Sequence, residues 1–237
     1  MANDKRKILL IAPHPDDIAY SCLLPALDIN NQCTVMTIFG RSRYGFGTSD
    51  NGDVEKVSAI RKCEDYRFCR FINAEQRYLY FSDSSITYSK DKSYEELYPM
   101  RNKLADIIKA EIGAGRYDCI YFPMALGWHY DHSIIRELIM DSVVPSYSGA
   151  CEFVMYEDLP YALDFTEQET EAKFTSMIGR LSESRFSKYK MSQPEIDRLN
   201  RAIDIYASQH EPDVVTKLLQ YKVFNGRVVE TFYKLYV

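Results

Sequence analysis

The first half of the chain alternates short apolar runs with longer segments in which apolar residues recur at helical spacing. Short apolar runs bounded by polar turns predict buried strands, and helical spacing predicts amphipathic helices. The predicted strands are 7–12, 33–39, 78–81 and 119–122, and the predicted helices are 17–29, 53–72 and 95–112. This alternation indicates βαβ units, and therefore an α/β fold with a mostly parallel sheet and helices on both faces.

The second half of the chain is less regular. The elements that we predict there are a strand at 153–156, helices at 166–185 and 194–209, and a closing strand at 228–236. No internal repeat, low-complexity tract or linker divides the sequence, and 237 residues is an ordinary length for one α/β domain. We therefore expect a single domain over 1–237, with a less regular C-terminal part from about 151.

Composition and charge narrow the classes of function. Hydrophobic residues make up 46% and charged residues 27% of the chain, which is the balance of a globular protein with a packed core. The formal net charge is -5 and the basic residues are dispersed, which argues against nucleic acid as a partner. No apolar run approaches the ~20 residues of a membrane helix, and the short start is polar. We expect a cytoplasmic protein without membrane insertion.

Three of the four histidines lie in two short polar clusters. His14 belongs to the sequence PHPDD, and His129 and His132 belong to the sequence HYDH. Each cluster follows a predicted strand directly. Because active sites of parallel α/β sheets lie beyond the carboxyl ends of the strands, we expect both clusters to meet at one edge of the sheet.

The residue types in these clusters predict a catalytic zinc site. Imidazole nitrogens and carboxylate oxygens bind zinc, and a catalytic zinc has three protein ligands and one water, which His14, Asp17 and His132 would supply. Asp17 lies near a predicted helix N-terminus, where the helix dipole favours the ionised carboxylate. A bound zinc lowers the pKa of its water and polarises a carbonyl. Asp16 is then free to act as the general base.

Two further residues of the second cluster have predicted roles. His129 precedes His132 by three positions and would stabilise a developing oxyanion as an imidazolium. Asp131 would orient one of the histidines. A helix cap with a chance histidine, or a solvated polar turn, would explain either cluster alone. The two clusters together favour the metal site.

These motifs resemble the LmbE-like or PIG-L N-deacetylases, whose members carry (A/P)HPDD after the first strand and HxDH further on. The resemblance implies a Rossmann-like three-layer α/β/α sandwich, zinc ligands at His14, Asp17 and His132, and Asp16 as the base. It gives His129 the role of electrophilic or acid partner. It also implies an acyl group on the nitrogen of a small molecule as the target, with an N-acetylated amino sugar as the leading class.

The resemblance extends to RKCED at 61–65, to Asp83, and to YASQ at 206–209, so it spans most of the chain. It suggests that Arg61 and Asp83 contact the substrate, and we add Arg41, which lies on a glycine-rich loop where it could clamp an anionic group. One departure is Ile18, where the family most often has glutamate. This departure puts local support of the site and substrate choice in question. The resemblance leaves a homo-oligomer open.

Alternative functions remain at this point. The same site would serve a hydrolase of another amide or of a carbamate in a specialised biosynthetic pathway, and Fe²⁺ or another divalent metal would fit the same ligands. A non-catalytic metal-binding relative is a further alternative, although it would have no need of Asp16 and His129. A dinuclear phosphoesterase is disfavoured, because the few histidines leave little for a second metal.

Overall fold

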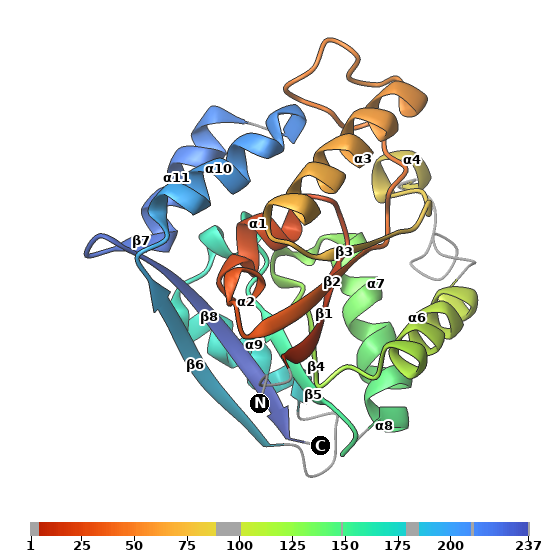
Figure 1. The fold of residues 1–237 in the computed structure, drawn as a ribbon, viewed down its shortest axis with the longest axis vertical. Coiled ribbons are helices and arrows are strands. Elements are labelled where there is room, and N and C mark those ends of the chain that lie inside the picture. The colour runs from red at the N-terminus through yellow and green to blue at the C-terminus, as the bar shows by residue number, and fades with distance from the viewer. Residues whose placement is uncertain (1–4, 89–100, 148, 179–184, 210, 237) are drawn as a thin grey trace.

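One mixed sheet organises the protein in the computed structural model, which describes residues 5–88, 101–147, 149–178, 185–209 and 211–236 (Figure 1). The strands are β1 (Arg6–Ala12), β2 (Asn31–Thr37), β3 (Glu75–Tyr78), β4 (Cys119–Pro123), β5 (Glu152–Tyr156), β6 (Arg185–Gln193), β7 (Val223–Phe224) and β8 (Arg227–Tyr236). Their order is β3-β2-β1-β4-β5-β8-β6, and β7 pairs with β8. Strands β1 to β5 are parallel, whereas β8 runs antiparallel to β5 and β6. The predicted mostly parallel α/β sheet is confirmed.

Helices occupy the connections between the strands. They are α1 (Asp17–Ser21), α2 (Leu23–Leu27), α3 (Val54–Phe71), α4 (Ser84–Thr87), α6 (Arg101–Gly115), α7 (Tyr130–Leu138), α8 (Val144–Tyr147), α9 (Glu167–Ile178), α10 (Ile196–Ile205) and α11 (Pro212–Lys222). Figure 1 shows α3 beside α10 at the top and α6 beside α7 and α8 at the right. None of the described helices has both the length and the apolar character that crossing a bilayer requires.

The centre of the sheet explains where a site can form. From Ile8 to Ala12, β1 is completely buried, as expected for a parallel strand covered on both faces. The chain leaves β1 through α1 and α2 to β2 on one side, whereas β4 pairs with β1 on the other side. Strand order therefore reverses at β1, and a crevice opens beyond the ends of β1 and β4.

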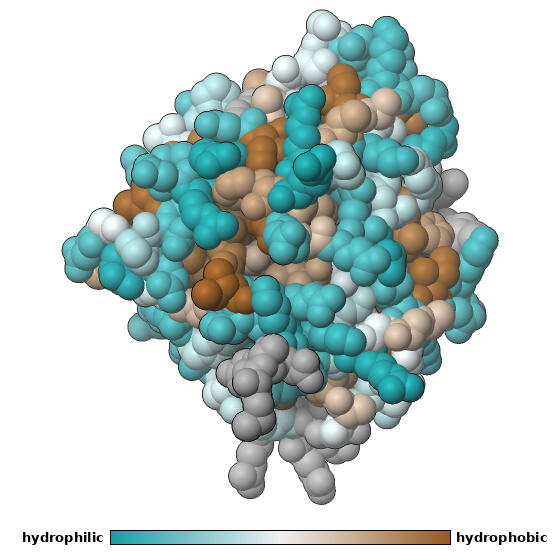
Figure 2. Space-filling view, in the orientation of Figure 1, coloured by the Kyte–Doolittle hydropathy of each residue, from teal (hydrophilic) through white to brown (hydrophobic). Residues whose placement is uncertain are grey.

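The surface in Figure 2 is mostly hydrophilic, with hydrophobic residues gathered near the middle, around α1 and α2.

The helix predicted over 17–29 consists in the structure of the two short helices α1 and α2. The backbone at Cys22 has φ -142° and ψ 34°, which interrupts the helix, and Pro25 lies within the second one. Proline removes a backbone donor, which disfavours one long helix here.

Several other predictions need correction. The third strand ends rather than begins at Tyr78, so the predicted strand 78–81 is displaced. The described part of the predicted helix 166–185 is α9 (Glu167–Ile178), and Arg185 already belongs to β6, a strand that we did not predict. Residues 179–184 of that helix, and 95–100 of the predicted helix 95–112, lie outside the described residues. Helices α7 and α11 were also missed.

Candidate metal centre

The two histidine clusters occupy neighbouring connections at one edge of the sheet. His14 and Asp17 lie between the end of β1 and the start of α1, and Asp17 is the first residue of that helix. His132 lies in the first turn of α7, which follows β4 after a 3₁₀ turn. Because β1 pairs directly with β4, these connections bring residues 118 positions apart together. The prediction that both clusters meet is confirmed.

The three predicted ligands lie within reach of one ion. His14 Nδ1 is 3.2 Å from His132 Nε2, Asp17 Oδ1 is 3.4 Å from His132 Nε2, and Asp17 Oδ2 is 3.7 Å from His14 Nδ1. Ligands of tetrahedral zinc lie about 2.0–2.2 Å from the metal and hence about 3.4 Å from one another. All three residues are buried. The donors and their spacing therefore fit a divalent metal ion.

The outer nitrogens of both histidines are held by carboxylates. His14 Nε2 lies 2.9 Å from Asp131 Oδ2, and His132 Nδ1 lies 2.7 Å from Asp158 Oδ1. An ionised carboxylate can only accept, so these nitrogens donate. The remaining ring nitrogens then face the shared point between them, where a metal ion could take the place of a proton. Such carboxylate–histidine pairs orient metal ligands and raise their basicity.

The charges around the point shared by His14, Asp17 and His132 favour a cation there. Burial raises the pKa of Asp17 to about 6, and the neighbouring histidines oppose that shift. Burial also opposes ionisation of His132, but Asp17 and Asp158 outweigh it and raise its pKa to about 9. Buried carboxylates that lack enough positive charge are costly. A divalent ion at the shared point would supply that charge.

His129 takes a different place from the two histidines discussed above. Its ring lies 5.0 Å from that of His14 and 5.1 Å from that of His132, measured between centroids, and the three histidines could also hold an ion together. Its Nδ1 is buried without a hydrogen-bond partner among the described residues. Burial, followed by the two other histidines, lowers its pKa to about 2. The structure therefore does not support the predicted imidazolium, and His129 is a neutral donor or acceptor here.

A cavity of about 490 Å³ opens onto these groups. It is lined by His14, Asp16, Asp17, Tyr44, Arg61, Asp83, Ser84, Ser85, Tyr88, Gly127, His129, Tyr130, Asp131, Leu159, Pro160, Tyr161 and Gln209. Its volume falls within the range of about 300–1,000 Å³ that is usual for small-molecule sites. Most of the predicted site residues thus share one cavity with the candidate metal centre.

Arg61 joins the predicted base to a predicted substrate contact. Its guanidinium is buried and lies 3.5 Å from Asp16 and 3.8 Å from Asp83, on opposite nitrogens. Within the part of the chain that the structure describes, its Nε has no hydrogen-bond partner. A buried guanidinium with unused donors can bind acceptor atoms of a ligand that enters the cavity.

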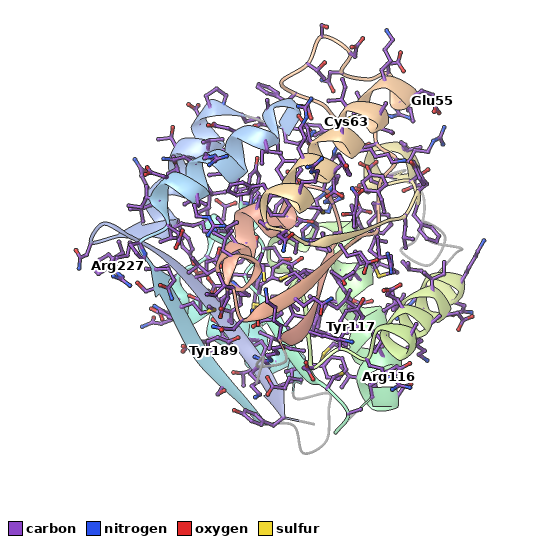
Figure 3. The ribbon with its side chains drawn as sticks, viewed as in Figure 1. Glu55, Cys63, Arg116, Tyr117, Tyr189 and Arg227 are labelled. Carbon is purple, nitrogen blue, oxygen red and sulfur yellow. The ribbon has the colours of Figure 1, made fainter. Side chains whose placement is uncertain are left out.

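Two of the residues that the sequence analysis singled out, Arg41 and Ile18, do not line the cavity. Arg41 does not line the cavity and pairs with Glu55 at 2.8 Å, and Glu55 projects from the outer end of α3 in Figure 3. Ile18, at the position where the related motif has glutamate, is completely buried in the hydrophobic core. The side chain at this position therefore supports packing beneath the site.

The sequence singles out residues 157–161, after the predicted strand 153–156, as a possible part of a lid, but it assigns no chemical role to two residues there that belong to the site. Asp158, which holds His132, also accepts a hydrogen bond from Leu126 N at 2.9 Å. Tyr161 packs its ring 5.0 Å from His129 and 5.2 Å from His132, between centroids. Both follow β5, the neighbour of β4, so the rule that sites form beyond strand ends could have indicated them.

Comparisons with known proteins identify the family of this chain. The family model described as PIG-L, GlcNAc-PI de-N-acetylase, matches residues 9–143, which is more than half of the chain. The 2'-N-acetylparomamine deacetylase of Streptomyces fradiae is 28% identical over 223 residues, covering 91% of this chain and 77% of that protein.

Solved structures share the fold. A deacetylase of the teicoplanin biosynthesis pathway superposes with a TM-score of 0.75 at 20% identity, covering 97% of both chains. The N,N'-diacetylchitobiose deacetylase of Pyrococcus horikoshii has a TM-score of 0.61 at 21% identity, covering 98% of this chain and 85% of that one. A zinc-inhibited form of teicoplanin deacetylase has a TM-score of 0.73 at 20% identity and covers 97% of both chains. At these identities the likeness establishes the architecture.

Proposed function

The chain belongs to the PIG-L family of de-N-acetylases, and from this premise we propose that it is a metal-dependent amidohydrolase that removes the acetyl group from an N-acetylated amino sugar within a larger conjugate. One observation carries the proposal. His14 Nδ1 and His132 Nε2 lie 3.2 Å apart beside Asp17, and Asp16 lines the same cavity. A binding module would need the ligands but not the additional carboxylate.

Three residues would hold the metal, namely His14, Asp17 and His132. Zinc is the ion we propose, with Fe²⁺ as the alternative, because both accept imidazole and carboxylate ligands. When bound, the ion would polarise the amide carbonyl and lower the pKa of a coordinated water. Asp131 and Asp158 accept from one ring nitrogen of each histidine, which would leave the other nitrogen of each ring to bind the ion.

Asp16 and His129 would carry the proton and charge movements. Asp16 accepts one proton of the attacking water and returns it to the leaving nitrogen, so that an amine and a carboxylic acid are released, and the acid then loses its proton to the solvent. The guanidinium of Arg61 lies 3.5 Å from the Asp16 carboxylate and places a positive charge beside it. His129, held neutral, donates a hydrogen bond to the oxygen that becomes negative as the carbonyl is attacked.

The substrate class rests on the cavity and on the relatives. Arg61 and Asp83 offer a donor and an acceptor side by side, which suits the neighbouring hydroxyls of a sugar ring. Relatives act on 2'-N-acetylparomamine and on N,N'-diacetylchitobiose. Amino-sugar conjugates are therefore the class to test first, ahead of other amides or carbamates.

The test measures amine release from N-acetylglucosamine, N,N'-diacetylchitobiose and 2'-N-acetylparomamine, with an N-acetylated amino acid and a carbamate as controls. The protein is used as purified, after removal of metal with a chelator, and after addition of Zn²⁺ or Fe²⁺. We expect activity on at least one sugar conjugate, its loss with the chelator, and its return with one metal. Turnover that survives complete metal removal would exclude the proposed mechanism.

A further inference from the structure

One wall of the cavity is an aromatic ring that packs against the candidate metal centre. Tyr161 lines the cavity, and its ring lies 5.0 Å from the ring of His129 and 5.2 Å from the ring of His132, between centroids. His132 is a proposed metal ligand, and His129 is the proposed donor to the carbonyl oxygen of the substrate. The side chain of Tyr161 therefore borders the position that this oxygen would take.

The hydroxyl of Tyr161 has no hydrogen-bond partner among the residues that the structure describes. Other tyrosines of the same region differ, because Tyr156 donates to Ile11 O at 2.8 Å and Tyr221 donates to Glu157 at 2.9 Å. The hydroxyl of a buried tyrosine usually finds a partner. Because Tyr161 lines the cavity, a ligand bound there can accept the hydrogen bond that its hydroxyl does not make within the protein.

The charges that act on this hydroxyl indicate which way it faces. Burial raises the pKa of Tyr161 well above its ordinary value, and the charges that raise it further are those of Asp17, Asp16, Asp131 and Asp158, in that order. Asp17 is a proposed metal ligand, so the hydroxyl lies on the side of the ring that faces the candidate metal centre. A phenol with an ordinary pKa of about 10 is already protonated at neutral pH and can donate.

The backbone fixes the position of Tyr161 relative to the metal ligands. Tyr161 begins the 3₁₀ turn η3 (Tyr161–Asp164), and Asp158, three residues earlier, accepts from His132 Nδ1 at 2.7 Å. Gly127, between β4 and α7, has a φ of 74°, and a Cβ atom at this position would lie 2.8 Å from Tyr161 Cβ. Glycine permits both this backbone conformation and the close approach. The two segments therefore hold the tyrosine ring against His132.

We propose that Tyr161 is a further catalytic residue, whose hydroxyl donates a hydrogen bond to the carbonyl oxygen of the substrate and stabilises the negative charge that develops there as water adds. This inference rests on the proposed function. A carbonyl oxygen has two lone pairs, so it can accept from Tyr161 and from His129 together. Tyr161 keeps its proton throughout, and Asp16 alone transfers the proton of the water. Donors placed where charge develops lower the barrier without reorganisation.

The kinetic test uses Tyr161→Phe, which keeps the ring that packs against the histidines and removes only the hydroxyl. On the best substrate kcat should fall about 10²-fold, because the hydrogen bond matters most in the transition state. KM and the metal Kd, measured by chelator competition, should stay near their wild-type values. Tyr66→Phe, which changes an exposed tyrosine of α3 outside the cavity, is the matched control and should keep full activity. Unchanged kcat in Tyr161→Phe would overturn the proposal.

Binding provides a second measurement that does not depend on turnover. The probe is the methylphosphonamidate of glucosamine, whose tetrahedral phosphorus and negative oxygens imitate the attacked amide, and N-acetylglucosamine is the planar, neutral comparison. Calorimetry with the zinc-loaded protein should show that Tyr161→Phe weakens binding of the phosphonamidate about tenfold and leaves binding of N-acetylglucosamine unchanged.

The outcomes of the binding test separate this contact from the proposed reaction. Equal loss for the two compounds would show that Tyr161 only shapes the cavity and would overturn the proposal, as would a wild-type protein that does not bind the phosphonamidate. If no sugar conjugate is hydrolysed but the variant loses affinity for the phosphonamidate alone, the proposed reaction fails and the contact of Tyr161 with the oxygen stands.

Discussion

Two of the places where the protein buries charged side chains differ in how completely they are paired. Lys222 and Glu230 meet beneath α2, where the lysine donates to Tyr20 O at 2.8 Å and to the glutamate at 2.5 Å. Glu230 also accepts from the backbone N–H groups of Leu23 at 3.0 Å and Leu24 at 2.9 Å. Here the polar groups stabilise one another and the first turn of a short helix.

The candidate metal centre lacks this completeness. Arg61 Nε and His129 Nδ1 are buried and have no hydrogen-bond partner in the described ranges, and burial raises the pKa of Asp17. Unsatisfied buried groups cost free energy, and proteins tend to tolerate them at functional sites, where a ligand or ion can satisfy them. The comparison suggests that completed polar burial maintains the fold, whereas incomplete polar burial marks the site.

The largest expected effect comes from Asp16→Asn. Without a general base, kcat on the best substrate should fall by about 10²–10⁴-fold, while the metal stays bound because Asp16 is not a proposed ligand. Amine release and metal analysis by mass spectrometry measure the two quantities. Asp204→Asn, an exposed carboxylate of α10, is the control and should keep full activity. Full activity in Asp16→Asn would remove this residue from the mechanism.

The next effect concerns stability and comes from Lys222→Met. This change leaves Glu230 buried without its cation, so the free energy of unfolding should fall by about 3–5 kcal/mol. Urea titration measures this loss, and kcat of the folded fraction should stay near the wild-type value. Lys217→Met, which changes an exposed lysine of α11, should leave the unfolding midpoint almost unchanged. A loss of activity larger than the loss of folded protein would contradict the comparison.

The sequence predicted much of this arrangement because local patterns encode it. Apolar runs identified the buried strands β1 and β4, and the motif residues after them, His14 and His132, did meet. The rule that parallel neighbours deliver their following loops to one edge needs no knowledge of side-chain packing. The parallel half of the sheet was therefore predictable.

The remainder depends on tertiary context. Strand β6 lies at the edge of the sheet and carries Lys188 and Lys190. Because edge strands often carry charged residues, β6 lacks the apolar run from which the other strands were predicted. Asp158 follows β5 in the segment 157–161, to which the sequence alone assigns no chemical role, and its role appears only when His132 is found against it. Arg41 was instead predicted as a substrate contact from its position on a loop. The structure pairs it with Glu55, and the loop position alone does not show this pairing.

The smallest expected effect concerns the hydroxyl of Ser84 and its contribution to metal binding. Ser84→Ala removes the side-chain hydrogen bond to Asp131 but keeps the backbone one, which should cost about 0.5–1.5 kcal/mol and weaken metal binding about two- to tenfold. Chelator competition gives the metal Kd, and thermal unfolding of the metal-free protein shows whether the fold is affected. Ser84→Thr should restore the affinity. Thr87→Val removes a hydroxyl from the same helix that bonds to Asp83 O instead, so it should leave the metal Kd unchanged. If both variants weaken metal binding equally, α4 merely supports the fold, and Asp131 holds His14 without help from this serine.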